Sequence, residues 1–296
     1  MSVQTEVLPL PSTSKFRAYF ELLKFRLTSL VVFSSVMTYL LASHGDVDYV
    51  KLGWLILGGL MVTGSSNTIN QIAERELDKL MTRTLSRPLP TGRLSVLEAA
   101  IYSVALGIGG LLVMAIFVNV MTALLCLISL MLYGFVYTPM KRLSPIAVLI
   151  GAIPGAMPPL IGWVAMTGQI TVEGLILFGI QFMWQFPHFW AIAWVLDDDY
   201  KRAGFKLLPS GGGRDVRTAL QIMIYTLMLI PLGLLPYQFG MTGITSAIIA
   251  TVSGTLFLMS TFHLMRECSR KAALGIMFGS FLYLPIVQIA FVFDKL

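Results

Sequence analysis

Charged residues and cysteines are scarce in this chain of 296 residues. Only 12% of the residues are charged, whereas about a quarter are charged in an ordinary soluble domain. This shortage argues against a soluble globular protein. The two cysteines, Cys126 and Cys268, stand singly in or beside apolar runs, which argues against a disulfide framework and a cysteine metal cluster. We assign no function to either cysteine.

Apolar residues, in contrast, make up 56% of the chain, and the mean hydropathy is +0.79. Long apolar runs recur, each near the ~20 residues that a membrane-spanning helix needs. The runs are 27–43, 52–72, 95–117, 118–138, 144–166, 172–196, 217–237, 240–262 and 273–293. The third and fourth runs are almost continuous. The pattern predicts an all-α, polytopic membrane protein with nine transmembrane helices around a central cavity, forming a single domain over residues 1–296.

The distribution of basic residues predicts the orientation in the membrane. Residues 1–26 are polar and lack the short apolar core of a cleavable signal. If this segment is cytoplasmic, all lysines and arginines except Lys51 and Lys295 fall on the cytoplasmic side. We therefore expect a bacterial plasma (inner) membrane protein with a cytoplasmic N-terminus and cytoplasmic charged loops. The net charge of +6 then reflects topology, with attraction to the lipid bilayer, and no nucleic acid partner is expected.

The first charged loop, "NQIAERELDKLMTRTLSRPLPTG", spans residues 70–92 and places its acids before its bases. Asn70, Glu74 and Asp78 are four residues apart, so on a helix they project from one face. Such oxygen ligands suit Mg²⁺, and the bases beyond them suit a phosphate. The alternative is a solvated loop with ion pairs four residues apart. We favour function because Asn70 and Glu74 lie near membrane depth, where polar groups are costly.

A second charged loop, "DDDYKRAGFKLLPSGGGRD", spans residues 197–215 and resembles the first at an offset of 119. At that offset Asp78 aligns with Asp197, Arg83 with Arg202, Arg87 with Lys206, and Leu89-Pro90-Thr91-Gly92 with Leu208-Pro209-Ser210-Gly211. The alignment suggests a parallel repeat of four helices, although chance is an alternative for so few matches. Two such loops facing one cavity could hold a diphosphate between two metal sites.

The first loop also resembles a known sequence motif. "N-x-x-x-E-x-x-x-D-x-x-M-x-R-T-x-x-R-P", residues 70–88, is similar to the first acidic motif of the UbiA superfamily of intramembrane prenyltransferases. Its Met-x-Arg-Thr part is similar to the protohaem IX farnesyltransferase branch. Two positions depart from the usual pattern. Glu74 stands where most members have Asp, and Lys24-Phe25-Arg26 stands where Lys-Pro-Arg is frequent; we read the second departure as neutral.

Further stretches carry the same resemblance over nearly the whole chain. They are "YTPMKRLSP" (137–145), "IGAIPGAMPPLIGW" (150–163), "WQFPHFWAIAWVLDDDYKRAGFKLLP" (184–209) and "GSFLYLPIVQI" (279–289). The resemblance implies transfer of a farnesyl group from farnesyl diphosphate to a vinyl group of protohaem IX (haem b). Water would add to give haem O, diphosphate would leave, and Mg²⁺ would be the cofactor. It also implies a downstream haem-modifying enzyme as a partner.

The resemblance assigns roles to individual residues. Asn70, Glu74 and Asp78 would hold one Mg²⁺, and Asp198 and Asp199 the other. The repeat alignment favours Asp197 for the second site instead, and both options stay open. The candidates for binding the diphosphate are Arg83, Arg87, Lys141, Arg142, Arg202 and Lys206. Lys141 and Arg142 are equally what any cytoplasmic loop would contain.

His188 follows Pro187 within the run 172–196. A lone histidine in a helix usually serves packing, but polar residues inside a membrane span are usually functional. Imidazole is a familiar ligand of haem iron. We therefore predict that His188 is catalytic or faces the substrate, with axial ligation of haem as one version of that role. Trp184 and Gln185 are candidate pocket walls; His44 and His263 receive no role.

The run 144–166 combines small residues with prolines: Gly151, Pro154, Gly155, Pro158, Pro159 and Gly162. This composition predicts close helix packing and kinks. Two other functions are considered. A related prenyltransferase could act on a quinone or chlorophyll-type acceptor with the same metal chemistry. A transporter would need charges near the membrane midplane, accessible from both sides, whereas here the charges gather at one end of the spans.

Overall fold

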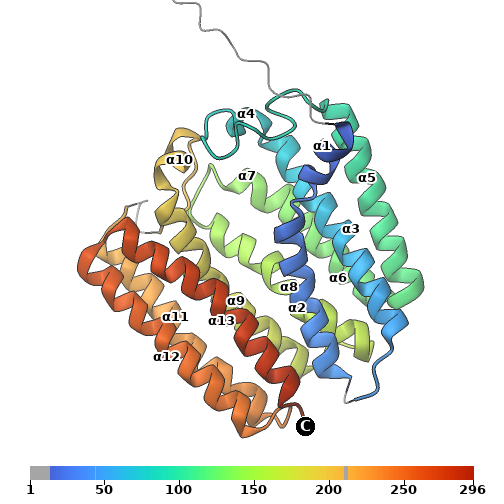
Figure 1. Ribbon diagram of the computed structural model, residues 1–296, viewed down its shortest axis with the longest axis vertical. Helices are drawn as coiled ribbons and strands as arrows, with labels where there is room; N and C mark the ends of the chain where they lie inside the picture. Colours follow the sequence, from blue (N-terminus) through green and yellow to red (C-terminus); the bar gives the residue numbers. More distant parts are fainter. Residues whose placement is uncertain (1–13, 44, 210–212) are drawn as a thin grey trace, which may run out of the picture.

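The computed structural model describes residues 14–43, 45–209 and 213–296, and these residues form a bundle of helices (Figure 1). The helices are α1 (Lys15–Leu22), α2 (Phe25–Ala42), α3 (Tyr49–Ala73), α4 (Arg75–Asp78), α5 (Val96–Val113), α6 (Val120–Met131), α7 (Thr138–Met140), α8 (Ala147–Thr167), α9 (Val172–Val195), α10 (Asp197–Arg202), α11 (Val216–Gln238), α12 (Ile244–Glu267) and α13 (Arg270–Phe293). Two π-helical segments, η1 (Met114–Val118) and η2 (Leu132–Tyr137), extend α5 and α6. The predicted all-α architecture is confirmed.

Eight helices of the described residues are long and apolar enough to cross a membrane. They correspond to eight of the nine predicted runs. The remaining run, 52–72, lies in α3, which has 25 residues but is less apolar because its second half is rich in polar side chains. These side chains, among them Ser65, Asn67 and Gln71, are buried against other helices. The predicted count of nine is therefore approximate. Eight helices of the described residues are both long and apolar enough to cross a membrane, whereas α3 is long enough but too polar.

The boundary between the third and fourth runs lies at Asn119. Its backbone is extended, with φ −170° and ψ 161°, and its side chain accepts a hydrogen bond from the Thr122 N–H. Asn119 therefore ends one span and caps the next. The predicted boundary between residues 117 and 118 is confirmed to within two residues.

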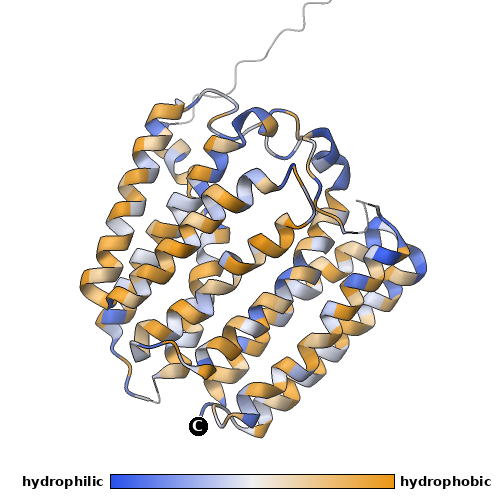
Figure 2. Cartoon of the chain, turned by 180° about the vertical axis from the view of Figure 1, so that it is seen from behind, coloured by the Kyte–Doolittle hydropathy of each residue, from blue (hydrophilic) through white to orange (hydrophobic). Residues whose placement is uncertain are grey.

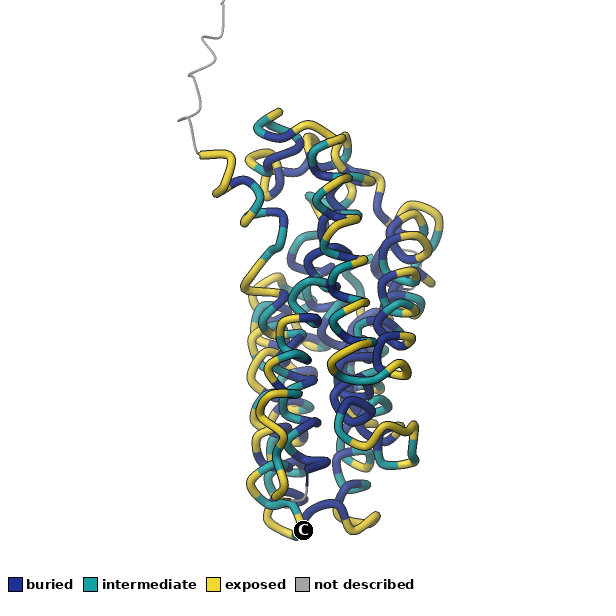
Figure 3. Tube along the Cα trace, turned by 90° about the vertical axis from the view of Figure 1, so that its right-hand side faces the viewer, coloured by how far each residue is buried: buried dark blue, intermediate teal, exposed yellow. Residues whose placement is uncertain are grey.

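Helix α8 lies at the centre of the bundle, between α2, α6 and α9 (Figure 1). Gly162 allows this position, because a Cβ atom there would lie 2.0 Å from the Ser35 carbonyl oxygen of α2. Helices α9, α11, α12 and α13 pack as a second group. The apolar residues cover the shafts of the helices (Figure 2), and the buried residues face the interior of the bundle (Figure 3).

The prolines of α8 leave backbone oxygens without helical donors. Pro159 lacks the N–H that would bond the Gly155 oxygen. That oxygen instead accepts hydrogen bonds from Nε2 of Gln181 and of Gln185, both at 2.8 Å. Ser129 Oγ donates to the Pro154 oxygen at 3.4 Å. Neighbouring helices thus satisfy the two oxygens that Pro158 and Pro159 free, which is required where water is absent.

The charged loops and the C-terminus lie at opposite ends of the bundle. Helices α1, α4 and α10 gather at the end away from the C-terminus (Figure 1). At the C-terminal end, Lys295 Nζ donates to the Leu40 oxygen at 2.9 Å and lies 3.2 Å from Ser43 Oγ. We call the end that carries α4 and α10 the charged end. It contains the basic residues that the sequence pattern assigns to one side of the membrane.

Candidate active site

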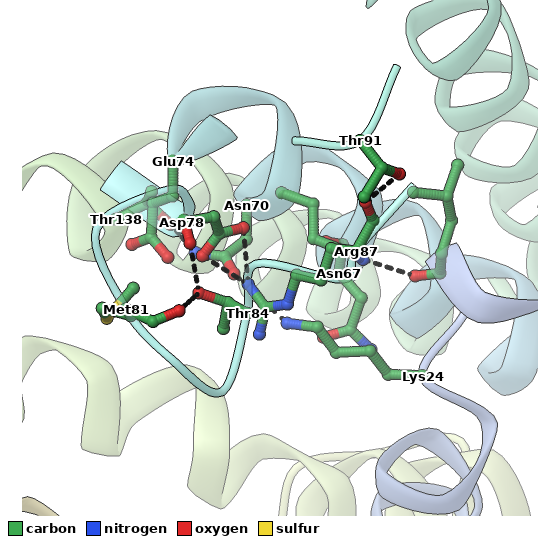
Figure 4. A network of polar contacts seen from close by, with 12 residues as sticks. Lys24, Asn67, Asn70, Glu74, Asp78, Met81, Thr84, Arg87, Thr91 and Thr138 are labelled. Carbon is green, nitrogen blue, oxygen red and sulfur yellow. Dashed lines mark hydrogen bonds and ion pairs between the residues drawn. The ribbon is translucent and has the colours of Figure 1, made fainter. Parts of the chain in front are cut away.

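The acids of the first loop follow a break in the helix. Helix α3 ends at Ala73, and Glu74 has φ −98° and ψ 6°. The Glu74 N–H still bonds the Asn70 oxygen at 3.0 Å, and the Asp78 N–H bonds the Glu74 oxygen at 2.8 Å. The hydrogen-bond pattern of a helix therefore continues through the break. Asn70, Glu74 and Asp78 lie close together (Figure 4), with exposed fractions of only 2%, 5% and 0%.

Each of these three side chains has a basic partner, which comes from the same loop for Asp78 and from distant parts of the chain for Glu74 and Asn70. Arg87 Nη1 donates to both carboxylate oxygens of Asp78, at 2.8 and 2.7 Å. Lys141 Nζ donates to Glu74 at 2.8 Å, and Lys24 Nζ donates to Asn70 Oδ1 at 3.3 Å. The Asn70 amide also donates to Thr138 Oγ1 at 3.2 Å. A buried, compensated cluster of opposite charges results (Figure 4).

The solvated-loop alternative describes only the outer acid of this loop. Glu76 is exposed and pairs with Lys79 at 2.8 Å and with Arg75 at 3.4 Å. Both partners are neighbours in the sequence, as expected for a surface loop. Glu74 and Asp78 instead reach partners that lie across the site. The two kinds of acid are therefore distinguished by burial and not by spacing alone.

Lys24 is a residue of this cluster that the sequence analysis missed. It lies between α1 and α2 in the left-handed region, with φ 48° and ψ 52°, a conformation that costs a residue other than glycine about 1–2 kcal/mol. Burial lowers the pKa of Lys24 to about 7, and the nearby positive charges of Arg87 and Lys141 act in the same direction. The available signal was a lysine at the start of the first span, on the same side as the acids.

Lys141 connects the first loop, its own loop and the second loop. Its ammonium group bonds Glu74, and its backbone oxygen accepts the Lys206 N–H at 2.9 Å. It also lies over the Tyr137 ring, 4.6 Å from the centroid. Burial disfavours the charge of Lys141, but the Glu74 carboxylate together with the nearby Tyr133 and Tyr200 outweighs this effect, so the pKa of Lys141 is raised. Arg142, its predicted companion, is exposed.

The second loop contains a buried acid and an exposed one next to each other. Asp197 has an exposed fraction of 6% and pairs with Lys201 at 2.7 Å and Arg214 at 3.5 Å. The Asp198 side chain is 78% exposed and meets Arg214 at 3.0 Å. Arg214 was not among the predicted bases. Burial thus favours Asp197 over Asp198 as part of an internal site.

Asp199 and Arg202 connect the second loop to the first. The Asp199 side chain is only 15% exposed and is paired with Arg202. Arg202 Nη2 also donates to Thr82 Oγ1 at 2.9 Å. Arg83 and the Lys206 side chain are exposed. The structure thus brings Arg87 and Lys141 into the buried cluster and leaves the other four predicted bases exposed.

The acids form two groups at the charged end. Among the residues that the structure describes, no three aspartate, glutamate, histidine or cysteine side chains converge on one point. The first group offers an amide and two carboxylates, and these oxygen donors fit Mg²⁺, which usually takes one or two carboxylates and keeps waters. Each carboxylate of that group now bonds a base, so a divalent ion there would compete with Arg87 and Lys141.

The helix breaks do not coincide at the predicted repeat offset. Asp78 lies four residues beyond the break at Glu74, whereas Asp197 directly follows the break at Leu196. Ser210 and Gly211 of the alignment, like His44, lie outside the described residues. The four-helix repeat stays a prediction.

His188 lies in α9, about 13 Å along a helix from Asp197. Its Nδ1 is 2.8 Å from Ser280 Oγ of α13, and its ring stacks on Trp184 with centroids 4.3 Å apart. Trp184 Nε1 donates to the Ser280 oxygen at 3.0 Å. Gln185 instead faces α8. The remaining described histidine, His263, is exposed and lies 3.4 Å from Glu267.

Comparison with known proteins gives consistent matches over almost the full length. The sequence pattern of the UbiA prenyltransferase family matches residues 30–284. A protoheme IX farnesyltransferase from Cytophaga hutchinsonii is 60% identical over 283 residues, covering 96% of this chain and 99% of the relative. The protoheme IX farnesyltransferase from Christiangramia forsetii is 45% identical over 290 residues, covering 96% and 95%.

Solved structures share the fold at lower sequence identity. A digeranylgeranylglyceryl phosphate synthase matches with a TM-score of 0.80 and 23% identity, covering 95% of this chain and 99% of that one. A UbiA homologue from Archaeoglobus fulgidus, bound to GPP and Mg²⁺, matches with a TM-score of 0.61 and 18% identity, covering 93% and 99%. These likenesses show the same arrangement of helices.

Proposed function

This chain belongs to the UbiA prenyltransferase family, and we propose that it transfers the farnesyl group of farnesyl diphosphate to a vinyl group of protohaem IX. The relatives that are 60% and 45% identical to this chain are both named protoheme IX farnesyltransferase. The observation that carries the proposal is the buried cluster at the charged end, where Lys141 links Glu74 to the second loop. Such a cluster at the end of an apolar bundle suits a charged head with an apolar tail.

The residues of the cluster would bind the diphosphate as it leaves. Asn70, Glu74 and Asp78 would hold one Mg²⁺, and the acids of the second loop another. When bound, the metal supplies positive charge to the diphosphate oxygens. Arg87, Lys141 and Lys24 lie within the cluster and can add hydrogen bonds to the same oxygens. Fixed positive groups of this kind stabilise the charge that develops on a leaving group.

The apolar interior would protect the reactive farnesyl group from water until the vinyl carbon is in place. In the proposed reaction, C1 of the farnesyl group bonds one vinyl carbon as its bond to the diphosphate oxygen breaks, and water then adds to the other vinyl carbon, giving a hydroxyl group and releasing a proton. The product is haem O. We place the charged end at the cytoplasmic face of a bacterial inner membrane, because the basic residues gather there. A haem-modifying enzyme that consumes haem O would be the downstream partner.

The reaction can be tested directly. Membranes containing the protein are supplied with haem b, isotope-labelled farnesyl diphosphate and Mg²⁺, and the haem fraction is analysed by chromatography and mass spectrometry. The expected product is labelled haem O. Labelled product on an aromatic acid or a chlorophyll-type acceptor, with no haem O, would instead identify a related prenyltransferase with a different acceptor.

Variants of Asp78 and Arg87 test the acid cluster, because they separate the effect of a lost charge on turnover from its effect on the stability of the protein. Asp78→Ala should lower turnover by about 10²- to 10³-fold, the usual loss when one charge-stabilising group is removed. Arg87→Met should destabilise the protein by about 3–5 kcal/mol, because Asp78 would remain buried without a partner. The double variant Asp78→Asn, Arg87→Met should regain stability and stay inactive.

The control is Glu76→Gln, which changes an exposed acid of the same loop and should leave turnover unchanged. Stability is followed as the melting temperature in detergent, and turnover as haem O formed per minute. Wild-type turnover of folded Asp78→Ala would remove this residue from the proposed site.

A further inference from the structure

His188 and Ser280 form an isolated polar pair between α9 and α13, away from the acid cluster. Ser280 Oγ donates its hydrogen to the Met277 oxygen of its own helix at 2.6 Å. A hydroxyl group has only one hydrogen, so the 2.8 Å contact between Ser280 Oγ and His188 Nδ1 must be donated by the histidine. In a neutral imidazole ring this leaves Nε2 without a hydrogen and with a free lone pair.

Nε2 of His188 has no hydrogen-bond partner in the part of the chain that the structure describes. His188 as a whole is 91% buried, since its exposed fraction is 9%. Among the described residues, the fully enclosed side-chain nitrogen and oxygen atoms without a hydrogen-bond partner belong to Thr122, Trp190, Trp194, Thr242 and Asp197, whose Oδ2 is held by ion pairs instead. Nε2 of His188 is not among them, so part of its surface is accessible. An unpaired ring nitrogen of a buried histidine, open on one side, has the features of a ligand atom.

The orientation of the ring is fixed by its neighbours. Trp184 stacks on it with an interplanar angle of 18°, while Phe189 and Phe281 meet it edge-on at centroid distances of 5.3 and 5.2 Å. Trp184 also donates to the Ser280 backbone at 3.0 Å. Both α9 side chains are therefore bonded to the same residue of α13. Metal-binding histidines commonly have such a partner on the opposite nitrogen, which fixes the tautomer and orients the ring.

We propose that Nε2 of His188 ligates the iron of the haem substrate, and that Ser280 is a positioning residue that holds the ring in the required tautomer. This inference rests on the proposed function, which makes haem a substrate. Neutral imidazole is a common axial ligand of haem iron. The position is suitable as well. His188 precedes Asp197 by nine residues, about 13 Å at the rise of an α-helix, so the iron would lie deeper in the bundle than the diphosphate. The acceptor would then meet the farnesyl chain within the apolar region.

The coordination is tested on the full-length protein in detergent, loaded with haem b. Resonance Raman spectra of the ferrous form should contain an iron–histidine stretching band that shifts when the protein carries ¹⁵N-labelled histidine. His188→Gly should lose this band and convert haem more slowly. Added imidazole should restore both the band and the rate, because it fills the space of the missing ring. If His188→Gly does not fold, His188→Met serves instead and should replace the histidine signature with that of a thioether ligand.

The positioning role of Ser280 has a separate readout. Ser280→Ala should weaken haem binding by about 10- to 100-fold, the usual effect of losing the partner of a ligating histidine. Ser280→Thr, which keeps the hydroxyl, should stay near wild type, and the KM for farnesyl diphosphate should not change in either variant. Ser103→Ala is the control, because this buried serine bonds Ser65 between α3 and α5.

The outcomes separate the inference from the proposed function. An unchanged haem spectrum in folded His188→Gly or His188→Met would overturn the ligation, even if the wild-type protein makes haem O. Equal haem affinity in Ser280→Ala and wild type would overturn the positioning role. Histidine-ligated haem in a wild-type protein that makes no haem O would support the ligation and contradict the proposed reaction.

Discussion

Lys24 and Cys268 are the two residues other than glycine, among those the structure describes, that have a left-handed backbone conformation. Their φ angles are 48° and 46°. Cys268 ends α12, where such a conformation is usual and glycine is the common residue. Lys24 follows Leu23, the C-cap of α1, where a left-handed residue is also usual. Its conformation in addition carries its ammonium group to Asn70.

Glycine substitutions should separate these two cases. Both Cys268→Gly and Lys24→Gly remove the strain and should raise the free energy of unfolding by up to about 1 kcal/mol. Cys268→Gly should keep wild-type turnover. Lys24→Gly should lose about 10- to 100-fold in turnover, because a charge-assisted hydrogen bond to the substrate or to Asn70 is lost. Melting temperature and turnover are measured on the same samples; a fully active Lys24→Gly would show that the lysine is not part of the site.

The acids of the site could be predicted from the sequence, but their partners could not. The spacing of Asn70, Glu74 and Asp78 follows from helix geometry, and the structure keeps it through a break. The bond between Glu74 and Lys141 joins residues 67 positions apart. Its existence depends on how the two spans pack, and hydropathy contains no information on that packing. Lys24 was missed for the same reason.

The long helices could be predicted because a bilayer requires their length and their apolar character. Irregularities within them could not. The segments η1 and η2 are π-helical, and the apolar pattern that predicts a span does not distinguish π-helical from α-helical turns. α3 was counted as a span because of the apolar run 52–72, although its polar residues serve contacts inside the bundle. The prolines of α8 were expected to kink it. The sequence did not reveal that Gln181 and Gln185 donate to the Gly155 oxygen that Pro159 frees.

The close packing of α8 against α2 predicts that a larger residue at Gly162 separates the two helices and destabilises the protein. In Gly162→Ala the added Cβ would lie 2.0 Å from the Ser35 oxygen and 2.3 Å from Thr38 Oγ1. Backbone atoms cannot move aside as a flexible side chain can, so the helices must separate. The expected cost is about 3 kcal/mol or more, the upper range for overpacking.

Gly179→Ala in α9 is the matched control for this variant. Nothing lies within 4 Å of the Cβ position there, so alanine should be neutral or stabilise the helix by up to about 1 kcal/mol. Melting temperatures in detergent and the yield of monodisperse protein measure both effects. Equal stability of the two variants would contradict the close crossing of α2 and α8.

For the molecule as a whole, the separation of charge between the two ends of the bundle predicts an orientation in the membrane. The charged end holds both acidic loops and the bases that pair with them, whereas Lys51 and Lys295 lie toward the other end. A transporter needs polar groups reachable from both faces. A transferase that takes a soluble diphosphate from one side and a lipid-soluble acceptor from the membrane needs charge at one end only, as found here.

The orientation predicts which positions a membrane-impermeant thiol reagent can reach in intact cells. In a Cys268→Ser background, in which the remaining Cys126 is buried, one cysteine at a time is introduced at Tyr49 or Phe239. These positions are 75% and 53% exposed and lie toward the end of the bundle opposite α4 and α10. Matched cysteines are placed at Arg83 and Arg142, which are exposed at the charged end. Tyr49→Cys and Phe239→Cys should react with the reagent from outside, because the distribution of basic residues predicts that the charged end lies in the cytoplasm. Arg83→Cys and Arg142→Cys should react only after the membrane is opened. The reverse pattern would place the acid cluster outside the cell, away from a cytoplasmic supply of prenyl diphosphate, and would contradict the proposed reaction together with the topology.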